Sequence, residues 1–255
     1  MWSEMLNAEG AKTSEMLCAY APIFKGDSFV ADRTNDSIQV GSLKYNQEEA
    51  KTIRKIFKGK LFSGATSDDF KSSCSDCQIV HIASHAKAST GIQDESWILF
   101  NSKSDSIDEE KLQLHEIYNL DLNSELLVLS ACETASGKMV KGEGILSFAR
   151  SFSFAGTKSI LTSLWRVDDE ATKEIMTIFY KNLRLGQSKD FALQKAKIHY
   201  LKSARKNAPN YWAAFVAVGD MTPISPSPAP LIFWIVFPLA IIIWYVIRKK
   251  RMNSK

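Results

Sequence analysis

The chain has 255 residues, of which 45% are hydrophobic and 24% are charged, the composition of a globular domain with room for an appendage. The formal net charge is +4, but five positive charges lie after the last apolar stretch, at Arg248, Lys249, Lys250, Arg251 and Lys255. The other 27 basic residues face 28 acidic ones, a net charge of −1. The folded part has no basic bias, which excludes nucleic acid as an expected partner.

The first half of the chain alternates strand patterns with helical ones. Residues 78–84 are β-branched and apolar, which is typical of a strand buried on both faces. Residues 46–58 place apolar side chains at a helical period and carry Glu48 and Glu49 in the first turn. In chain order we expect strand 16–24, helix 46–58, strand 61–62, helix 66–70, strand 78–84, strand 97–100 and helix 112–120.

The second half continues this alternation. Gly142-Glu143-Gly144 leads into a helix that Gly156 ends, and this glycine pair lacks the spacing and the position after the first strand that a dinucleotide loop requires. We expect strand 126–130, helix 145–155, strand 159–164, helix 168–183, helix 188–205 and strand 211–218. Strands that alternate with helices of this length predict a mostly parallel, helix-covered sheet of the α/β class.

The C-terminal segment is predicted to anchor the chain in a membrane as a single span. Residues 231–247 are apolar at all seventeen positions, the lower limit for a spanning helix. The basic tail 248–255 resembles a cytoplasmic flank, and the proline-rich residues 221–230 predict a stiff linker. The alternative is a hydrophobic tail docked on the domain. The side of the membrane on which the domain lies stays open, because the N-terminus lacks a signal peptide.

Two of the predicted strands end near reactive side chains. His85 follows strand 78–84, and Cys132 follows strand 126–130. In open α/β sheets, sites form outside the carboxyl ends of the strands. A histidine beside a cysteine can accept the thiol proton and deliver it to a leaving amine. The backbone N–H groups of Cys132 and Ala86 are the candidate donors to an oxyanion. The alternative is an inert buried thiol and a core histidine.

The sequence resembles the CHAT domain family, a branch of the caspase, separase and gingipain clan of cysteine peptidases. Five motifs carry this resemblance, and their order over about 140 residues makes it specific. They are Val80–His85 (VHIASH), Leu127–Thr134 (LVLSACET), Gly142–Gly144 (GEG), Ala155–Asp169 with its SLWRVDD end, and Tyr211–Asp220 (YWAAFVAVGD).

The resemblance implies a caspase-like αβα sandwich over residues 17–220, with His85 and Cys132 as the catalytic dyad and with no metal or organic cofactor. In the family, a strand-rich segment and often tetratricopeptide helices precede the domain. Residues 1–16 are too short for either, so we expect either a truncated chain (the C-terminal part of a longer product) or a shortened gene product. The implied partners are a protein or peptide substrate and a tetratricopeptide-repeat region, in cis upstream or in trans.

The resemblance also directs attention to the pocket for the substrate residue before the cut. In this clan the pocket lies near Trp165, Asp168 and Asp169, so an acidic pair there favours a basic substrate residue. The alternative is that both acids only suit the dipole of the helix that they begin. One departure concerns Ala86, because the family usually has glycine after the catalytic histidine, and the added Cβ restricts the backbone.

The remaining cysteines and histidines offer weaker patterns. Cys74 and Cys77 form a lone CxxC without the two further ligands that zinc requires, so they are either unpaired thiols or a local disulfide. His81 precedes His85 by four residues, but no acidic third ligand lies nearby in the sequence, and no metal site is expected.

Together these patterns predict a membrane-anchored CHAT-type cysteine endopeptidase. The alternative is a catalytically inactive, caspase-like protein-interaction module tethered to the membrane, which Ala86 and the short N-terminal segment favour. A nucleotide-binding membrane protein is the weakest interpretation.

Overall fold

The computed structural model describes residues 13–24, 28–31, 37–40, 42–88, 96–101, 111–130, 132–133, 143–203 and 207–224. The predicted linker beyond Ile224, the membrane helix 231–247 and the basic tail lie outside these residues. Within the described part, no helix is both long and apolar enough to cross a membrane. The membrane anchor therefore stays a prediction.

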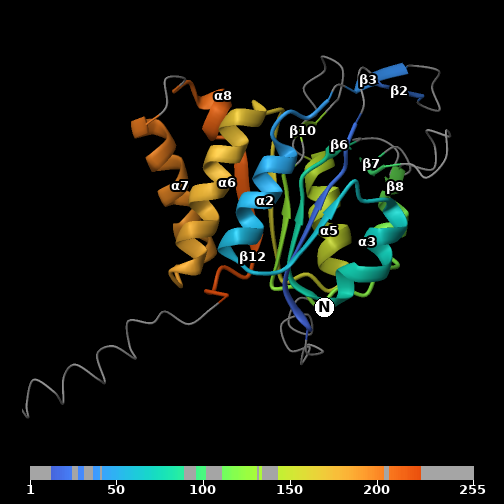
Figure 1. Ribbon diagram of the computed structural model, residues 1–255, viewed down its shortest axis with the longest axis horizontal. Helices are drawn as coiled ribbons and strands as arrows, with labels where there is room; N and C mark the ends of the chain where they lie inside the picture. The colour runs from blue at the N-terminus through green and yellow to red at the C-terminus, as the bar shows by residue number, and fades with distance from the viewer. Residues whose placement is uncertain are drawn as a thin grey trace, which may run out of the picture.

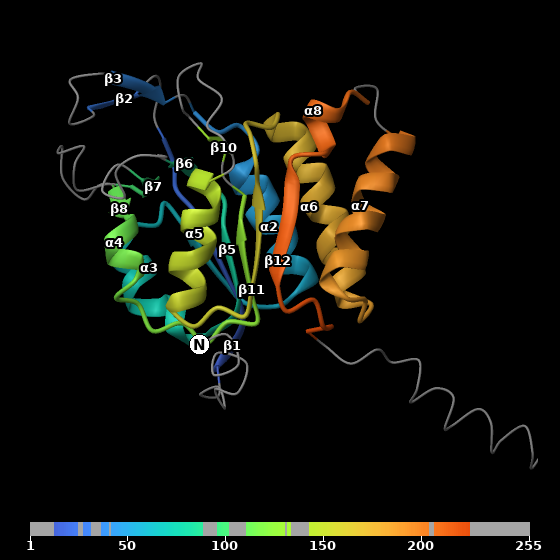
Figure 2. The same cartoon turned by 180° about the vertical axis from the view of Figure 1, so that it is seen from behind.

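A large sheet forms the centre of the domain (Figures 1 and 2). Its strands lie in the order β12-β11-β9-β5-β1-β4. Neighbours from β11 to β4 pair in parallel, and only β12 runs antiparallel to β11. The strands are β1 (Glu15–Ala21), β4 (Lys60–Ser63), β5 (Cys77–Ile82), β9 (Leu126–Leu129), β11 (Ser159–Ser163) and β12 (Phe215–Gly219). The predicted mostly parallel sheet is confirmed.

Helices cover both faces of this sheet, which makes an αβα sandwich (Figures 1 and 2). One face packs against α2 (Asn46–Ile56), α6 (Asp169–Arg184), α7 (Lys189–Ser203) and the short α8 (Pro209–Trp212). The other packs against α3 (Ser67–Ser73), which a 3₁₀ turn at Cys74–Asp76 follows, and against α4 (Leu114–Ile117) and α5 (Glu143–Phe154). All four residues of β9 are buried, as expected for a strand in a sheet whose two faces are both covered by helices.

The two faces hold separate hydrophobic clusters. Phe70 and Phe152 lie in the cluster on the α3 and α5 side, whereas Ile53 and Phe179 lie in the cluster on the α2 and α6 side. All four side chains are fully buried. Removing a side chain of this size from water contributes about 1.5–3 kcal/mol, so the packing of both layers fixes the sheet between them.

A smaller sheet continues from the carboxyl edge of the large one. It contains four strands in the order β10-β6-β7-β8. They are β6 (His85–Lys87), β7 (Trp97–Leu99), β8 (Lys111–Gln113) and β10 (Cys132–Glu133), and a separate hairpin joins β2 (Ser28–Ala31) to β3 (Ser37–Val40). The sequence patterns did not predict this second sheet.

Two predicted elements are wrong in part. Residues 111–113 form β8, which pairs with β7, and only 114–117 are helical, because strand pairing overrides the local helical pattern. The predicted strand 211–218 begins as α8, for which Pro209 supplies a favourable first residue, and β12 starts at Phe215.

A disulfide joins Cys18 of β1 to Cys77 of β5. Both predicted alternatives for Cys77, a local bond to Cys74 and a free thiol, are therefore wrong. Cys74 is a free, buried cysteine, and burial raises the pKa of its thiol to about 12. A thiol that stays protonated at neutral pH is a poor nucleophile, so Cys74 is not a competitor of Cys132.

Candidate active site

His85 and Cys132 are in register because each lies the same number of residues after one of a pair of neighbouring central strands. In the large sheet, Ile82 of β5 pairs with Leu129 of β9. Three residues later on each strand, His85 of β6 pairs with Cys132 of β10, again in parallel. Neighbouring strands lie about 4.8 Å apart, so the structure brings the two predicted dyad residues together as adjacent backbone positions. The side chain of Cys132 lies outside the described part.

The histidine strand is held by its surroundings. His85 is 5% exposed, and its ring packs beside that of Phe24, with 5.0 Å between the ring centroids. Ala86, the position expected to hold a glycine, pairs with Ile98 of β7 and with Glu133 of β10. His85 is therefore mostly enclosed and lies on a strand that has neighbours on both edges.

The turn between β5 and β6 is hydrogen-bonded to two other elements. Ser84 Oγ donates to the carbonyl of Leu99. Asn46 Nδ2, at the start of α2, donates to the carbonyl of Ala83 at 3.2 Å and to that of Pro22 at 2.8 Å. These bonds satisfy buried backbone carbonyls and fix the turn from which His85 emerges.

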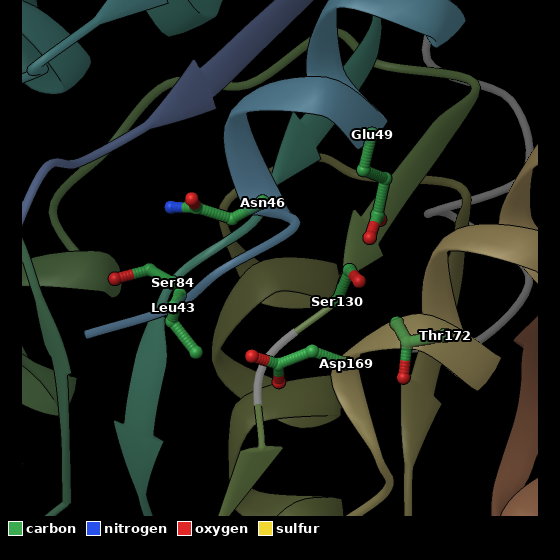
Figure 3. A pocket seen from close by; sticks show the side chains of 7 residues that line it. All are labelled: Leu43, Asn46, Glu49, Ser84, Ser130, Asp169 and Thr172. Carbon is green, nitrogen blue, oxygen red and sulfur yellow. The ribbon is translucent and has the colours of Figure 1, made fainter. Parts of the chain in front are cut away.

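The three predicted pocket residues have different contacts in the structure. Asp168 is the N-cap of α6, where Oδ1 accepts from the N–H of Ala171 at 3.2 Å, as the helix-dipole alternative expected. Trp165 Nε1 donates to the carbonyl of Asn210 at 3.1 Å. Asp169 instead lines a pocket between α2, α6 and the strand ends (Figure 3). Its role in substrate binding stays a prediction, as do those of Asp168 and Trp165.

The sequence patterns missed a buried polar network behind this pocket. His81 of β5 places Nε2 at 3.1 Å from Glu49 Oε1 and Nδ1 at 3.1 Å from the hydroxyl of Tyr180. The exposed fractions of His81 and Glu49 are 0% and 3%. Burial is the largest cause that raises the pKa of Tyr180 well above its usual value, and the nearby Glu49 carboxylate raises it further. The hydroxyl of Tyr180 therefore keeps its proton. The network fixes the position of the Glu49 carboxylate.

His81 and His85 do not form a pair in the structure. His81 belongs to β5 and to the Glu49–Tyr180 network, whereas His85 belongs to β6 in the other sheet. Within the described ranges, no group of three or more His, Cys, Asp or Glu side chains is placed to hold a metal ion.

A mostly parallel sheet lies between two helical layers, with a histidine and a cysteine in register at its carboxyl edge, and this arrangement defines an α/β domain of the αβα sandwich type. The family model for the CHAT domain matches residues 9–220, and the chain belongs to this family. The solved structure of the Arg-specific cysteine proteinase gingipain R has a similar fold, with a TM-score of 0.52 and 14% identity over 87% of this chain and 51% of that chain. This likeness concerns the fold alone.

Two curated relatives are tetratricopeptide repeat proteins. Tetratricopeptide repeat protein 28 of Mus musculus is 31% identical over 117 residues, which are 46% of this chain and 5% of the relative. The protein of the same name from Homo sapiens is 30% identical over 126 residues, 49% of this chain and 5% of the relative. The chain thus matches a small part of much longer proteins.

Proposed function

We propose that this chain is a membrane-anchored cysteine endopeptidase that uses Cys132 and His85. The main observation in support is that Cys132 of β10 and His85 of β6 pair in parallel, as adjacent backbone positions. A cysteine needs a base or cation beside it to form the nucleophilic thiolate, and the imidazole is that group. The CHAT family membership and the caspase-like fold support the same reaction class.

The reaction proceeds through an acyl-enzyme. His85 takes the thiol proton while the sulfur of Cys132 attacks the peptide carbonyl, and the N–H groups of Cys132 and Ala86 stabilise the resulting oxyanion. The C–N bond breaks as His85 passes the proton to the leaving amine. Water then attacks the thioester, with His85 as its base, and releases the carboxylate product.

The proposed context combines a membrane and a repeat region. Residues 231–247 tether the domain as a single C-terminal span, close to substrates at the same surface. The tetratricopeptide repeat relatives support a repeat region, in cis or in trans, as the partner that presents or controls the substrate.

The second candidate is an inactive interaction module on the same membrane. Ala86 favours it, because a residue with a Cβ occupies the position after the histidine, beside the expected oxyanion. The region around His85 and Cys132 would then bind a partner segment without cleaving it.

Labelling and cleavage separate the two candidates. We expect an electrophilic peptide probe to modify Cys132 in the wild-type chain, and His85→Ala to lose most of this modification and of the cleavage of a peptide library. One oxyanion donor alone is worth about 10²–10³ in rate, and loss of the base is expected to cost at least as much. Cys74→Ala is the matched control and should keep both signals. Cleavage that persists in Cys132→Ala would overturn the peptidase assignment.

A further inference from the structure

Helix α7 is apolar on two opposite sides. One side is buried in the hydrophobic cluster that it shares with α6. The other side carries three large apolar residues, Phe191, Ile198 and Leu201, which are 43%, 40% and 38% exposed. Phe191 and Ile198 are two helical turns apart, and Leu201 follows one turn later, so the three share one side. Figures 1 and 2 show that α7 forms the outer edge of its helical layer, beyond α6. A helix that is apolar on both sides is expected where both sides are covered, so the outer side of α7 indicates a partner.

Lysines flank this outer apolar stripe. Lys195 and Lys202 are exposed, and each follows an apolar residue of the stripe by one turn. Lys195 Nζ lies 5.0 Å from the centroid of the Phe191 ring, so positive charge and apolar surface are side by side. The 15 residues of α7 include four lysines and a single acid, Asp190, at the start of the helix. An apolar stripe bordered by lysines is typical of a helix that lies in the interface of an anionic membrane.

The described chain leaves the domain beside the first turn of α7. The N–H of Lys189 donates to the carbonyl of Met221 at 3.0 Å, and Lys189 Nζ donates to the carbonyl of Asp220 at 2.9 Å. Lys189 is only 1% exposed, so these bonds are shielded from water. Ile224 packs against the hydrophobic cluster on the α2 and α6 side. The point of exit is therefore fixed relative to α7.

The predicted anchor begins close to this point in the sequence. Six residues, 225–230, separate Ile224 from the apolar segment 231–247. Even a fully extended chain covers no more than about 25 Å between Ile224 and Leu231. Helix α7 is itself about 22 Å long, at 1.5 Å per residue. A bilayer that the segment 231–247 enters thus lies within about one helix length of the start of α7, and the outer side of α7 can reach it.

We propose that the outer side of α7 is a membrane-docking face, which lies on the anionic lipid surface of the bilayer that holds the anchor. The proposal rests on the membrane anchor of the proposed function and adds the orientation of the domain. Phe191, Ile198 and Leu201 enter the boundary between headgroups and acyl chains, while Lys195 and Lys202 contact the lipid phosphates. The domain is then held in one orientation instead of rotating on its linker.

The alternative occupant of this face is the chain's own apolar segment, 231–247. It has no charged residue, and the basic cluster Arg248–Arg251 follows it directly. It would therefore cover the apolar stripe but offer no acid to Lys195 and Lys202. An anionic lipid surface matches both the apolar and the basic part of the face, which is why we favour it.

The test measures contact between α7 and lipid in the full chain. Gln194 is exposed within the docking face, and Gln194→Cys can carry an environment-sensitive fluorophore in a Cys74→Ala, Cys132→Ala background, because Cys18 and Cys77 are joined in a disulfide. The protein is reconstituted into vesicles of phosphatidylcholine and phosphatidylserine that contain spin-labelled acyl chains.

We expect the spin-labelled lipid to quench the fluorophore at position 194. The same fluorophore at Ser72→Cys, an exposed position of α3 on the other side of the sheet, should keep its emission. Vesicles without phosphatidylserine should reduce the quenching at position 194. Equal emission from the two positions in anionic vesicles would overturn the proposal.

Two matched substitutions test the apolar stripe, and two more test the lysines. Ile198→Asp introduces an acid into the docking face and should abolish the quenching at position 194. Phe154→Asp changes an apolar residue of α5 that is 64% exposed and should retain it. Lys195→Gln and Lys202→Gln should each weaken docking about fivefold, the contribution of one lysine near an anionic surface. Urea unfolding confirms that each variant is folded.

Carbonate extraction of the same vesicles separates failure of the docking face from failure of the anchor. A retained chain without quenching at position 194 would refute the docking face and leave the anchor standing. A chain that carbonate releases, but whose fluorophore is quenched by lipid before extraction, would support the docking face and refute the anchor. A released chain whose fluorophore is shielded from aqueous iodide and not quenched by lipid would show that the segment 231–247 covers α7, and would refute both.

Discussion

At the scale of single residues, some features of the candidate site can be predicted from the sequence, and others appear only in the structure. His85 and Cys132 stand out because each follows a buried apolar strand, and the register of β6 and β10 brings them together. Glu49 looks like an ordinary acid in the first turn of a helix. Only the packing of α2 over β5 reveals that its carboxylate is buried against His81.

The ionisation of Asp169 predicts how the stability of the domain depends on pH. Burial is the largest cause of its raised pKa; Asp168 and Glu49 raise it further, whereas the Lys44 N–H and Arg166 act against this. A carboxyl with a raised pKa binds its proton more tightly in the folded state than in the unfolded chain, so the free energy of unfolding should fall as pH increases through this raised pKa. The measurement is urea unfolding of the full chain between about pH 4 and 7. Asp169→Asn should remove this part of the pH dependence; an unchanged profile would exclude Asp169 as the titrating group.

At the scale of elements, local patterns predict the central strands and the long helices, because both are periodic over many residues. They fail where pairing with a distant segment decides the structure. Residues 111–113 become a strand because β7 lies beside them. The stretch 78–85 divides into β5 and β6 because the chain changes sheets at Ala83 and Ser84, and this division aligns His85 with Cys132.

The turn after α5 provides a test at this scale. Gly156 has a φ of +105°, and a Cβ there would lie 1.9 Å from the carbonyl oxygen of Leu122. We expect Gly156→Ala to destabilise the fold by at least about 2 kcal/mol, since strain and a backbone clash add. Gly64 also has a positive φ, +69°, but a Cβ there meets its nearest neighbours at 3.8 Å, so Gly64→Ala should cost only about 1–2 kcal/mol. Urea unfolding measures both, and equal losses would contradict the clash.

At the scale of the whole molecule, the disulfide concerns the stability of the domain, and the predicted C-terminal anchor concerns its location. The bond between Cys18 and Cys77 closes a loop with a sequence separation of 59. A short proline-rich stretch separates the segment 231–247 from the domain. Each feature predicts a measurable property of the full chain.

Reduction of the disulfide is expected to destabilise the domain. In the loop-entropy description, a bond across this separation stabilises the folded state by about 4 kcal/mol. Dithiothreitol should therefore lower the urea midpoint of the wild-type protein. Cys74→Ala should retain this sensitivity, because Cys74 is not part of the bond, whereas Cys18→Ala should lack it. Equal midpoints with and without reductant would refute a stabilising bond.

Membrane retention tests the predicted anchor. The full chain should remain with lipid vesicles after alkaline carbonate extraction. A lysine near the centre of a span costs about 2.5–3.5 kcal/mol on insertion scales, so Ile242→Lys should lower retention. Lys255→Ala, in the basic tail, should not. Release of the wild-type chain by carbonate would favour the docked-tail alternative.

The sequence by itself determined the α/β class, the mostly parallel order of strands and helices, and the two reactive residues at the strand ends, because periodicity and motifs are local properties of the chain. The tertiary structure decided what depends on contacts between distant segments. It pairs Cys18 with Cys77, forms the second sheet that aligns His85 with Cys132, and buries the oxygens of Glu49, Ser130 and Thr172 around one cavity. These three residues lie on a helix, after a strand and on a second helix, and only close packing of the layers brings them together.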